Sequence, residues 1–253
     1  MARPAILLLR PRDRLRAGRR LCASLGLRAV AAPALEPRVL KRPRLGPAEI
    51  AVFTSRRAAE ALDRRALAPL RRAEIWGIGP DTARALRERG LRPRVPPVHS
   101  SAGLLRSLRP RVRGRRVLLL RSRQGDPALP RGLSAAGGSV RDAPLYTLER
   151  PRDSAALRRA VRESAAGRVE IFAFTSAGTA DSFLDAAREA GLELPVSRAM
   201  ARGVVAAMGQ PTRRVLRSRG VRVDFVPPRA DFEALVRGAR DLLFETLQKG
   251  PKS

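Results

Sequence analysis

Side chains that could hold an anion follow several short apolar runs of this sequence. They are hydroxyls and arginines, each placed directly after a predicted strand or at the start of a predicted helix. The set comprises Arg10, Ser55, Arg56, Thr82, Arg121, Thr175, Ser176 and Thr212. Ligands of open parallel sheets bind at the carboxyl ends of strands, where helix N-termini offer free N–H donors to carboxylates and phosphates. Taken singly, each hydroxyl also fits an N-cap or a turn. Taken together, they predict an anion-binding site.

Two strand-to-helix turns carry nearly the same glycine pattern. The first is "WGIGPDTARALRERGL" at residues 76–91, and the second is "AAMGQPTRRVLRSRGV" at residues 206–221. Glycines at such a turn let an anionic ligand approach the helix N-terminus. The match to a full GxGxxG dinucleotide motif is only partial. The turns therefore predict anion binding rather than a nucleotide cofactor.

Residues for most metal and cofactor chemistry are scarce. The single histidine, His99, fits a loop residue, and the single cysteine, Cys22, fits a buried apolar thiol. One histidine and one cysteine cannot form the usual metal cluster. No P-loop occurs, and the "FTS" segments at 53–55 and 174–176 lack the glycines and the histidine base of a nucleophile elbow. We therefore expect a site without metal or cofactor.

The net charge is extreme, +29 over 253 residues, and it attracts polyanions in general. However, 49 of the 52 basic residues are arginine, a bias that G+C-rich codons produce without selection for binding, and they are spread over every predicted helix. Aromatic residues make up 4% of the chain, too few for a base-stacking surface. Specific nucleic-acid binding is therefore disfavoured. An Arg-rich α/β module that binds nucleic acid or another polyanion without catalysis remains the alternative function.

No apolar run approaches the roughly 18 residues of a membrane span. The single cysteine suits a reducing compartment. We expect a cytoplasmic protein without membrane contact.

Short apolar runs alternate with helical patterns over almost the whole chain. This alternation predicts an α/β fold with parallel sheets that are covered on both faces. The predicted strands are 5–9, 28–32, 50–54, 74–78, 92–95, 116–120, 139–143, 170–175, 203–208 and 222–226.

The chain also repeats itself in order. "AILLLRPRD" resembles "RVLLLRSRQGD", and "AAPALEP" resembles "DAPLYTLERP", both at a shift of 111 positions. "VFTSRRAAEAL" resembles "AFTSAGTADSFL" at a shift of 121, and the glycine turns are 130 apart. Four matches with slowly growing spacing indicate a duplicated unit with insertions.

This ordered set of motifs resembles the uroporphyrinogen-III synthase family. "VFTSRRAAEAL", "GIGPDTARALRERGL", "RVLLLRSRQGDPALPRGLSAAGGSV", "APLYTLERP", "FAFTSAGTADSFL" and "AMGQPTRRVLRSRGVRVDFVP" have the order and spacing of that family, over residues 5 to about 240. The resemblance implies a cofactor-free lyase of tetrapyrrole biosynthesis. Such an enzyme closes the linear polycarboxylate hydroxymethylbilane to uroporphyrinogen III, with loss of water and inversion of ring D.

The resemblance also implies roles for single residues. Tyr146, in "LYTLE", matches a family tyrosine that faces the cleft, and we expect it to be the acid or hydrogen-bond donor for the leaving hydroxyl. The alternative is a linker tyrosine that packs against a domain edge. Thr82 and Thr212 match the threonines of the family's glycine turns. Pro211 stands where the family more often has a second hydroxyl, so the second turn departs from the family pattern at this position.

The resemblance further implies two similar parallel-sheet α/β domains with a cleft between them. Residues 1–36 with 153–253 would form one domain and residues 38–150 the other. The equivalent crossings at 31–40 and 142–152 would pair as a two-stranded connector. We expect a monomer, and transient contact with neighbouring pathway enzymes stays open.

Overall fold

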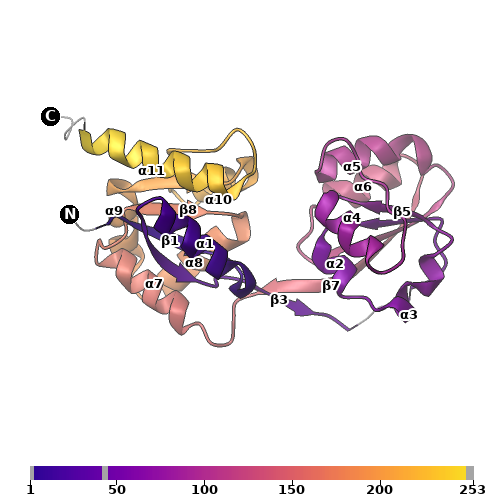
Figure 1. The fold of residues 1–253 in the computed structure, drawn as a ribbon, viewed down its shortest axis with the longest axis horizontal. Coiled ribbons are helices and arrows are strands. Elements are labelled where there is room, and N and C mark those ends of the chain that lie inside the picture. The colour runs from indigo at the N-terminus through magenta and orange to yellow at the C-terminus, as the bar shows by residue number, and fades with distance from the viewer. Residues whose placement is uncertain (1–2, 42–44, 249–253) are drawn as a thin grey trace. The chain divides into compact units, whose positions relative to one another are not determined.

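The chain divides into two compact units. The computed structural model describes residues 3–41 and 45–248. Unit 1 consists of residues 1–36 and 149–253, and unit 2 of residues 37–148 (Figure 1). The predicted limits of the two domains were 1–36 with 153–253, and 38–150. The chain leaves unit 1 through β3 (Glu36–Val39) and returns through β7 (Ser139–Glu149), and these two strands are neighbours in one sheet.

Unit 1 is built on a four-stranded sheet in the order β2-β1-β8-β9. The strands are β1 (Ala5–Leu9), β2 (Arg28–Ala32), β8 (Ile171–Phe174) and β9 (Val204–Ala207), and all three pairings are parallel. The helices are α1 (Arg12–Ser24), α7 (Ala155–Ala165), α8 (Ala177–Glu189), α9 (Glu193–Arg202), α10 (Gln210–Ser218) and α11 (Phe232–Gln248). Parallel pairing requires crossover connections, which the helices supply.

Both faces of the unit 1 sheet are buried because successive strand residues point to opposite sides. Leu7 and Phe172 belong to a core shared with α7, α8, α9 and α10. Leu8 and Ile171 belong to a second core shared with α1 and α11. This explains why the strands read as unbroken apolar runs such as "AILLL".

Unit 2 is built on a five-stranded sheet in the order β3-β7-β6-β4-β5. Besides β3 and β7, its strands are β4 (Ile50–Phe53), β5 (Glu74–Gly77) and β6 (Arg116–Ser122). The β7-β6, β6-β4 and β4-β5 pairings are parallel. The helices are α2 (Arg56–Glu60), α3 (Arg64–Leu67), α4 (Pro80–Arg87), α5 (Ser101–Leu108) and α6 (Ala128–Ala135), with 3-10 turns η1 (Ala68–Leu70) and η2 (Arg109–Arg111).

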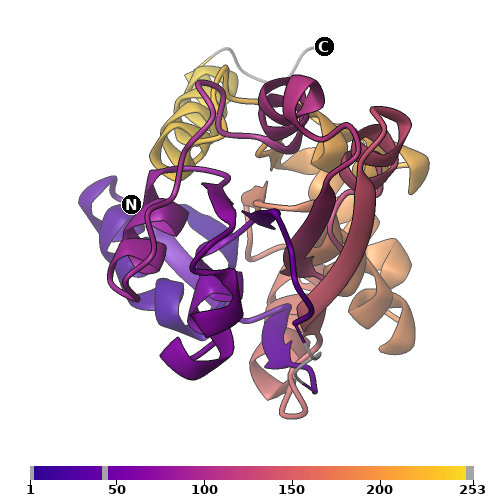
Figure 2. The same ribbon diagram turned by 90° about the vertical axis from the view of Figure 1, so that its right-hand side faces the viewer.

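Side chains on both faces of the unit 2 sheet are buried, and Figure 2 turns the ribbon so that this end of the molecule faces the viewer. Phe53 and Leu120 pack with α2 and α4, whereas Val52 and Leu119 pack with α5 and α6. The order β7-β6-β4-β5 matches β2-β1-β8-β9 of unit 1 strand for strand. The predicted α/β class with parallel sheets is therefore confirmed, and the sequence repeat corresponds to a repeat of the fold.

Two predicted strands, 92–95 and 222–226, are wrong. Each contributes one isolated bridge to its sheet, Trp76 to Arg94 and Ala206 to Phe225. Pro93 lies within the first segment and two prolines follow each segment, and proline cannot donate to a ladder. In the second segment, the Asp224 carboxylate accepts from the backbone N of Val205 at 2.9 Å, so a side chain occupies a donor that a ladder would use.

Candidate functional site

The carboxyl ends of three adjacent strands carry the predicted residues in each unit. In unit 1, Arg10 follows β1, Thr175 and Ser176 follow β8, and Thr212 lies in the first turn of α10, the helix that follows β9. In unit 2, Arg121 lies at the end of β6, Ser55 follows β4 and Thr82 lies in the first turn of α4, the helix that follows β5. Because these strands are neighbours in parallel sheets, each unit gathers its set along one sheet edge.

The glycine turns form two equivalent helix starts. Gly79 is the N-cap of α4 and Gly209 is the N-cap of α10, and neither helix receives a side-chain cap. Thr82 and Thr212 occupy the third position of their helices. The first backbone N–H groups of a helix have no partner within it. Each helix therefore presents uncapped donors and its positive dipole end at this edge of the sheet.

The hydroxyls of Thr82 and Thr212 are available to a ligand. The residues are only 3% and 4% exposed, and neither hydroxyl makes a hydrogen bond within residues 3–41 and 45–248. In that part of the chain, Nε of Arg213 is the one side-chain nitrogen or oxygen that is both fully buried and without a hydrogen-bond partner. Since the Thr82 and Thr212 hydroxyls also have no partner there, their oxygens are not fully buried and keep access to solvent. A side chain at Gly77 would lie 3.4 Å from Cγ2 of Thr82, so the methyl group packs against the turn.

Ser55 is the N-cap of α2, and its Oγ accepts from the backbone N of Ala58 at 3.0 Å. Tyr146, on β7, donates its hydroxyl to the same Oγ at 3.0 Å. Tyr146 is 7% exposed and packs in the core of unit 2 beneath α2 and α4. The structure thus brings Tyr146 to the predicted edge through Ser55.

Ser176 is the equivalent N-cap of α8 in unit 1. Its Oγ accepts from the backbone N of Thr179 and donates to the Thr179 hydroxyl, both at 3.2 Å. The preceding residue, Thr175, donates to the carbonyl oxygen of Leu9 at 3.3 Å and so ties the end of β8 to the end of β1. Ser176 is therefore engaged within a capping box.

Arg10 lies over the ring of Phe232, with its guanidinium carbon 3.8 Å from the ring centroid. Burial, followed by the charge of Arg14, lowers the pKa of Arg10 from its ordinary value. The described residues contribute no hydrogen bond to its guanidinium, so its N–H donors can serve an anion. Phe232, which positions it, was not foreseen from the sequence because it lies more than 200 positions away.

The remaining arginines of the set are engaged by carboxylates. Arg56 pairs with Glu60 at 2.6 Å on the exposed surface of α2. Arg121 is 7% exposed, bonds both carboxylate oxygens of Asp142 at 2.9 and 2.6 Å, and donates to the carbonyl of Asp126. A bidentate pair of this kind holds β6 to β7. The structure therefore gives Arg121 a structural partner that the sequence pattern did not indicate.

Two further residues lie at the glycine turns. His99 is exposed and contacts the first turn, because a Cβ at Gly79 would lie 3.5 Å from that of His99. Arg213 follows Thr212 and has the unpartnered Nε. Arg213 belongs to the "GQPTRR" motif, and its position directly after Thr212 is the sequence signal from which it could have been predicted as a site residue.

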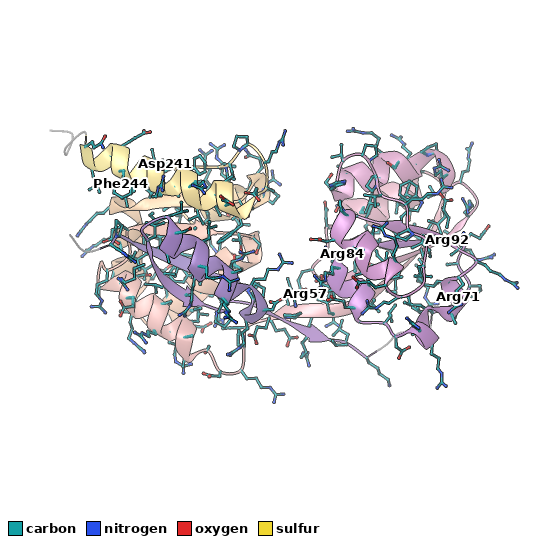
Figure 3. All side chains as sticks on the ribbon, in the orientation of Figure 1. Arg57, Arg71, Arg84, Arg92, Asp241 and Phe244 are labelled. Atoms are coloured by element: carbon teal, nitrogen blue, oxygen red, sulfur yellow. The ribbon has the colours of Figure 1, made fainter. Side chains whose placement is uncertain are left out.

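The described residues contain no group of three or more His, Cys, Asp or Glu side chains placed to hold a metal ion. Nor does any described helix have the length and apolar character needed to cross a membrane. The arginines are distributed over many segments, as the labelled Arg57, Arg71, Arg84 and Arg92 of unit 2 illustrate (Figure 3). Many are neutralised locally by acidic neighbours, for example Arg84 by Asp81 at 2.9 Å.

Comparisons with known proteins agree with this architecture. The structure resembles a crystal structure of a mutant uroporphyrinogen III synthase from the extremely thermophilic bacterium Thermus thermophilus, with a TM-score of 0.67 and 21% identity over 96% of this chain and 100% of that one. It also resembles the synthetase of Helicobacter pylori, with a TM-score of 0.64 and 16% identity over 95% and 99% of the two chains. At these identities the likeness concerns the fold.

The sequence comparisons are more specific. A protein of Methanothermobacter thermautotrophicus, provisionally named as a uroporphyrinogen-III synthase, is 31% identical over 225 residues, which are 84% of this chain and 88% of the relative. The uroporphyrinogen-III synthase of Chlorobaculum parvum is 23% identical over 177 residues, 69% and 68% of the two chains. A family model described as uroporphyrinogen-III synthase HemD matches residues 18–237. With this match over most of its length, the chain belongs to the uroporphyrinogen-III synthase family.

Proposed function

We propose that this chain is a uroporphyrinogen-III synthase, which closes linear hydroxymethylbilane to uroporphyrinogen III with loss of water and inversion of ring D. The observation that carries the proposal is the pair of equivalent glycine turns. Each unit presents a helix without a side-chain cap, and beside its free N–H donors stands a threonine hydroxyl with no partner among the described residues. Each of these helix starts suits a carboxylate, and the proposed substrate carries several.

Seven residues form the proposed substrate-binding set: Arg10, Ser55, Arg56, Thr82, Thr175, Ser176 and Thr212. Thr82 and Thr212 would each bind a carboxylate through the hydroxyl and the helix N-terminus. Ser176 and Thr175 already bond their neighbours, so their part is to fix the shape of the turn after β8. Arg121 is left out because its guanidinium is buried and bonded to the Asp142 carboxylate and the Asp126 carbonyl, whereas the ion pair of Arg56 with Glu60 lies on the exposed surface and can open to a ligand.

The reaction makes modest demands on side-chain chemistry. The hydroxymethyl group leaves as water, the resulting azafulvene is attacked at the substituted position of ring D, and a spiro intermediate then fragments and recloses. The pyrrole nitrogens supply the electrons. Holding the two ends of the substrate together is itself worth on the order of several kcal/mol of entropy. One hydroxyl donor near the departing oxygen completes the set, and Tyr146 with Ser55 supplies it.

The test is an assay in which hydroxymethylbilane is generated in place and the products are oxidised and separated as isomers. The unassisted ring closure yields the type I isomer, so a synthase is identified by the type III isomer. We expect type III to dominate when the purified chain is present. Formation of type I alone, at the rate without protein, would refute the proposal.

The same preparation tests the alternative, an Arg-rich module that binds nucleic acid. Binding to a phosphate backbone weakens steeply as salt rises. We expect isomer formation to persist at moderate ionic strength, where non-specific binding to a nucleic-acid duplex has weakened by orders of magnitude. The proposal includes a cofactor-free, monomeric, cytoplasmic enzyme. Activity after treatment with a chelator and the mass in solution check the first two of these properties.

A further inference from the structure

The two units place a serine at the same position and use its hydroxyl differently. Ser176 caps α8 and Ser55 caps α2, each directly after the equivalent strand. In unit 1, the third helical residue is Thr179, and its hydroxyl oxygen accepts a hydrogen bond from Ser176 Oγ at 3.2 Å. The Ser176 hydroxyl therefore both donates and accepts a hydrogen bond within the unit.

In unit 2, the third helical residue is Ala58, which has no hydroxyl to receive a proton. Ser55 Oγ instead accepts twice, from the backbone N of Ala58 and from the hydroxyl of Tyr146, both at 3.0 Å. A hydroxyl has two acceptor sites and one proton. With both acceptor sites filled, the proton of Ser55 points away from both partners, and it has no acceptor among the described residues.

Tyr146 and Ser55 differ in their exposure to solvent. Tyr146 is 7% exposed and packed in the core, whereas Ser55 is partly exposed at the carboxyl edge of the sheet. Accepting two hydrogen bonds polarises an O–H group and strengthens it as a donor. The buried phenol therefore fixes and polarises a serine hydroxyl that faces the substrate edge of unit 2.

We propose that Ser55 donates the hydrogen bond to the departing oxygen of the substrate's hydroxymethyl group, and that Tyr146 is its positioning residue. This inference rests on the proposed function. The C–O bond breaks with its electron pair on oxygen, which takes a proton from solvent and leaves as water. The pyrrole nitrogen supplies the pair for the new double bond, and its N–H proton is released to solvent. Ser55 keeps its proton and stabilises the oxygen while its charge develops.

Steady-state kinetics on four variants test the assignment. Ser55→Ala removes the donor, and we expect kcat to fall about 10- to 100-fold with little change in KM. Ser55→Thr retains the hydroxyl and should keep most of the activity. Tyr146→Phe removes only the positioning, so a smaller loss is expected, about threefold to tenfold. In the double variant, Tyr146→Phe should add nothing to Ser55→Ala, because Tyr146 acts through Ser55.

The matched control is Ser100→Ala. Ser100 caps α5 of the same unit and accepts from the backbone N of Gly103 at 3.1 Å, as Ser55 does for α2. Loss of either cap should lower stability, and more so in Ser55→Ala because Tyr146 also loses its acceptor, whereas only Ser55→Ala should lower kcat. Full kcat in Ser55→Ala, or an undiminished effect of Tyr146→Phe in the Ser55→Ala background, would overturn the assignment.

A second measurement does not depend on activity. Tyr146 is the only tyrosine of the chain, so the Raman doublet of tyrosine reports its hydrogen bond alone. We expect the signature of a donor in the wild type and its loss in Ser55→Ala. An acceptor signature in the wild type would refute the inference. Absence of the type III isomer would instead refute the proposed function, so the two failures are distinguishable.

Discussion

Replacing Thr82 or Thr212 by valine separates substrate binding from stability. Valine keeps the branched shape that packs against the turn and removes only the hydroxyl. That hydroxyl has no partner among the described residues, and its oxygen reaches solvent. No hydrogen bond within the described protein is lost, so we expect the free energy of unfolding to change by no more than about 0.5 kcal/mol.

The expected effect on binding is much larger. A hydrogen bond to a charged group contributes about 1.5–3 kcal/mol. Because these hydroxyls reach solvent and the helix N–H donors remain, the lower end applies, which corresponds to an about tenfold larger dissociation constant. The carboxylate is bound before and during the reaction, so KM should rise about tenfold while kcat stays nearly constant.

Thr147→Val is the matched control. Thr147 is equally buried, at 3% exposure, but its hydroxyl accepts from Nε2 of Gln124 at 2.7 Å. Valine there should cost about 1 kcal/mol, or about 2–4 °C in Tm for a chain of this size, with KM unchanged. Steady-state kinetics and thermal unfolding read the two effects. If Thr82→Val lowers Tm like the control and leaves KM unchanged, the hydroxyl is structural and the reasoning fails.

Three further predictions concern charge. Asp142→Asn should lower the free energy of unfolding by about 3 kcal/mol, because it leaves the buried guanidinium of Arg121 without a charged partner. Arg121→Met should lower it by only about 1 kcal/mol, because Asp142 is 39% exposed and can be rehydrated. Chemical denaturation measures both effects, and an unchanged KM in Arg121→Met excludes a substrate contact for Arg121. Burial raises the pKa of Cys22 to about 11, so a disulfide reagent should modify it only after unfolding; rapid modification of the native protein would contradict this. Desolvation opposes ionisation of Glu74, but hydrogen bonds led by Arg115 outweigh it and lower its pKa. Its stabilisation is therefore present above the unfolded value of about 4.3 and disappears as pH falls through the folded value, so Glu74→Gln should be less stable than the wild type, by about 1 kcal/mol or less, at neutral pH only.

Local patterns in the chain were enough to establish the α/β class and the internal repeat. Unbroken apolar strands such as 116–120, flanked by amphipathic helices, specify buried parallel sheets through local periodicity. The repeated motifs also indicated the family, because four ordered matches are a property of the chain and need no coordinates. The strand-end positions of Thr82 and Thr212 followed from the same patterns.

Which of these side chains are free depends on the folded chain. Ser55 and Ser176 have the same sequence context, an "FTS" segment after a strand, and Arg121 and Arg10 both follow an apolar strand. The difference comes from partners far along the chain: Tyr146 lies 91 positions from Ser55, and Phe232 lies beyond 200 positions from Arg10. The failed strands at 92–95 and 222–226 have the same origin, since the Asp224 side chain took a backbone donor of β9. Periodicity depends on neighbours three or four residues away, whereas hydrogen bonds and ion pairs depend on which strands the fold brings side by side.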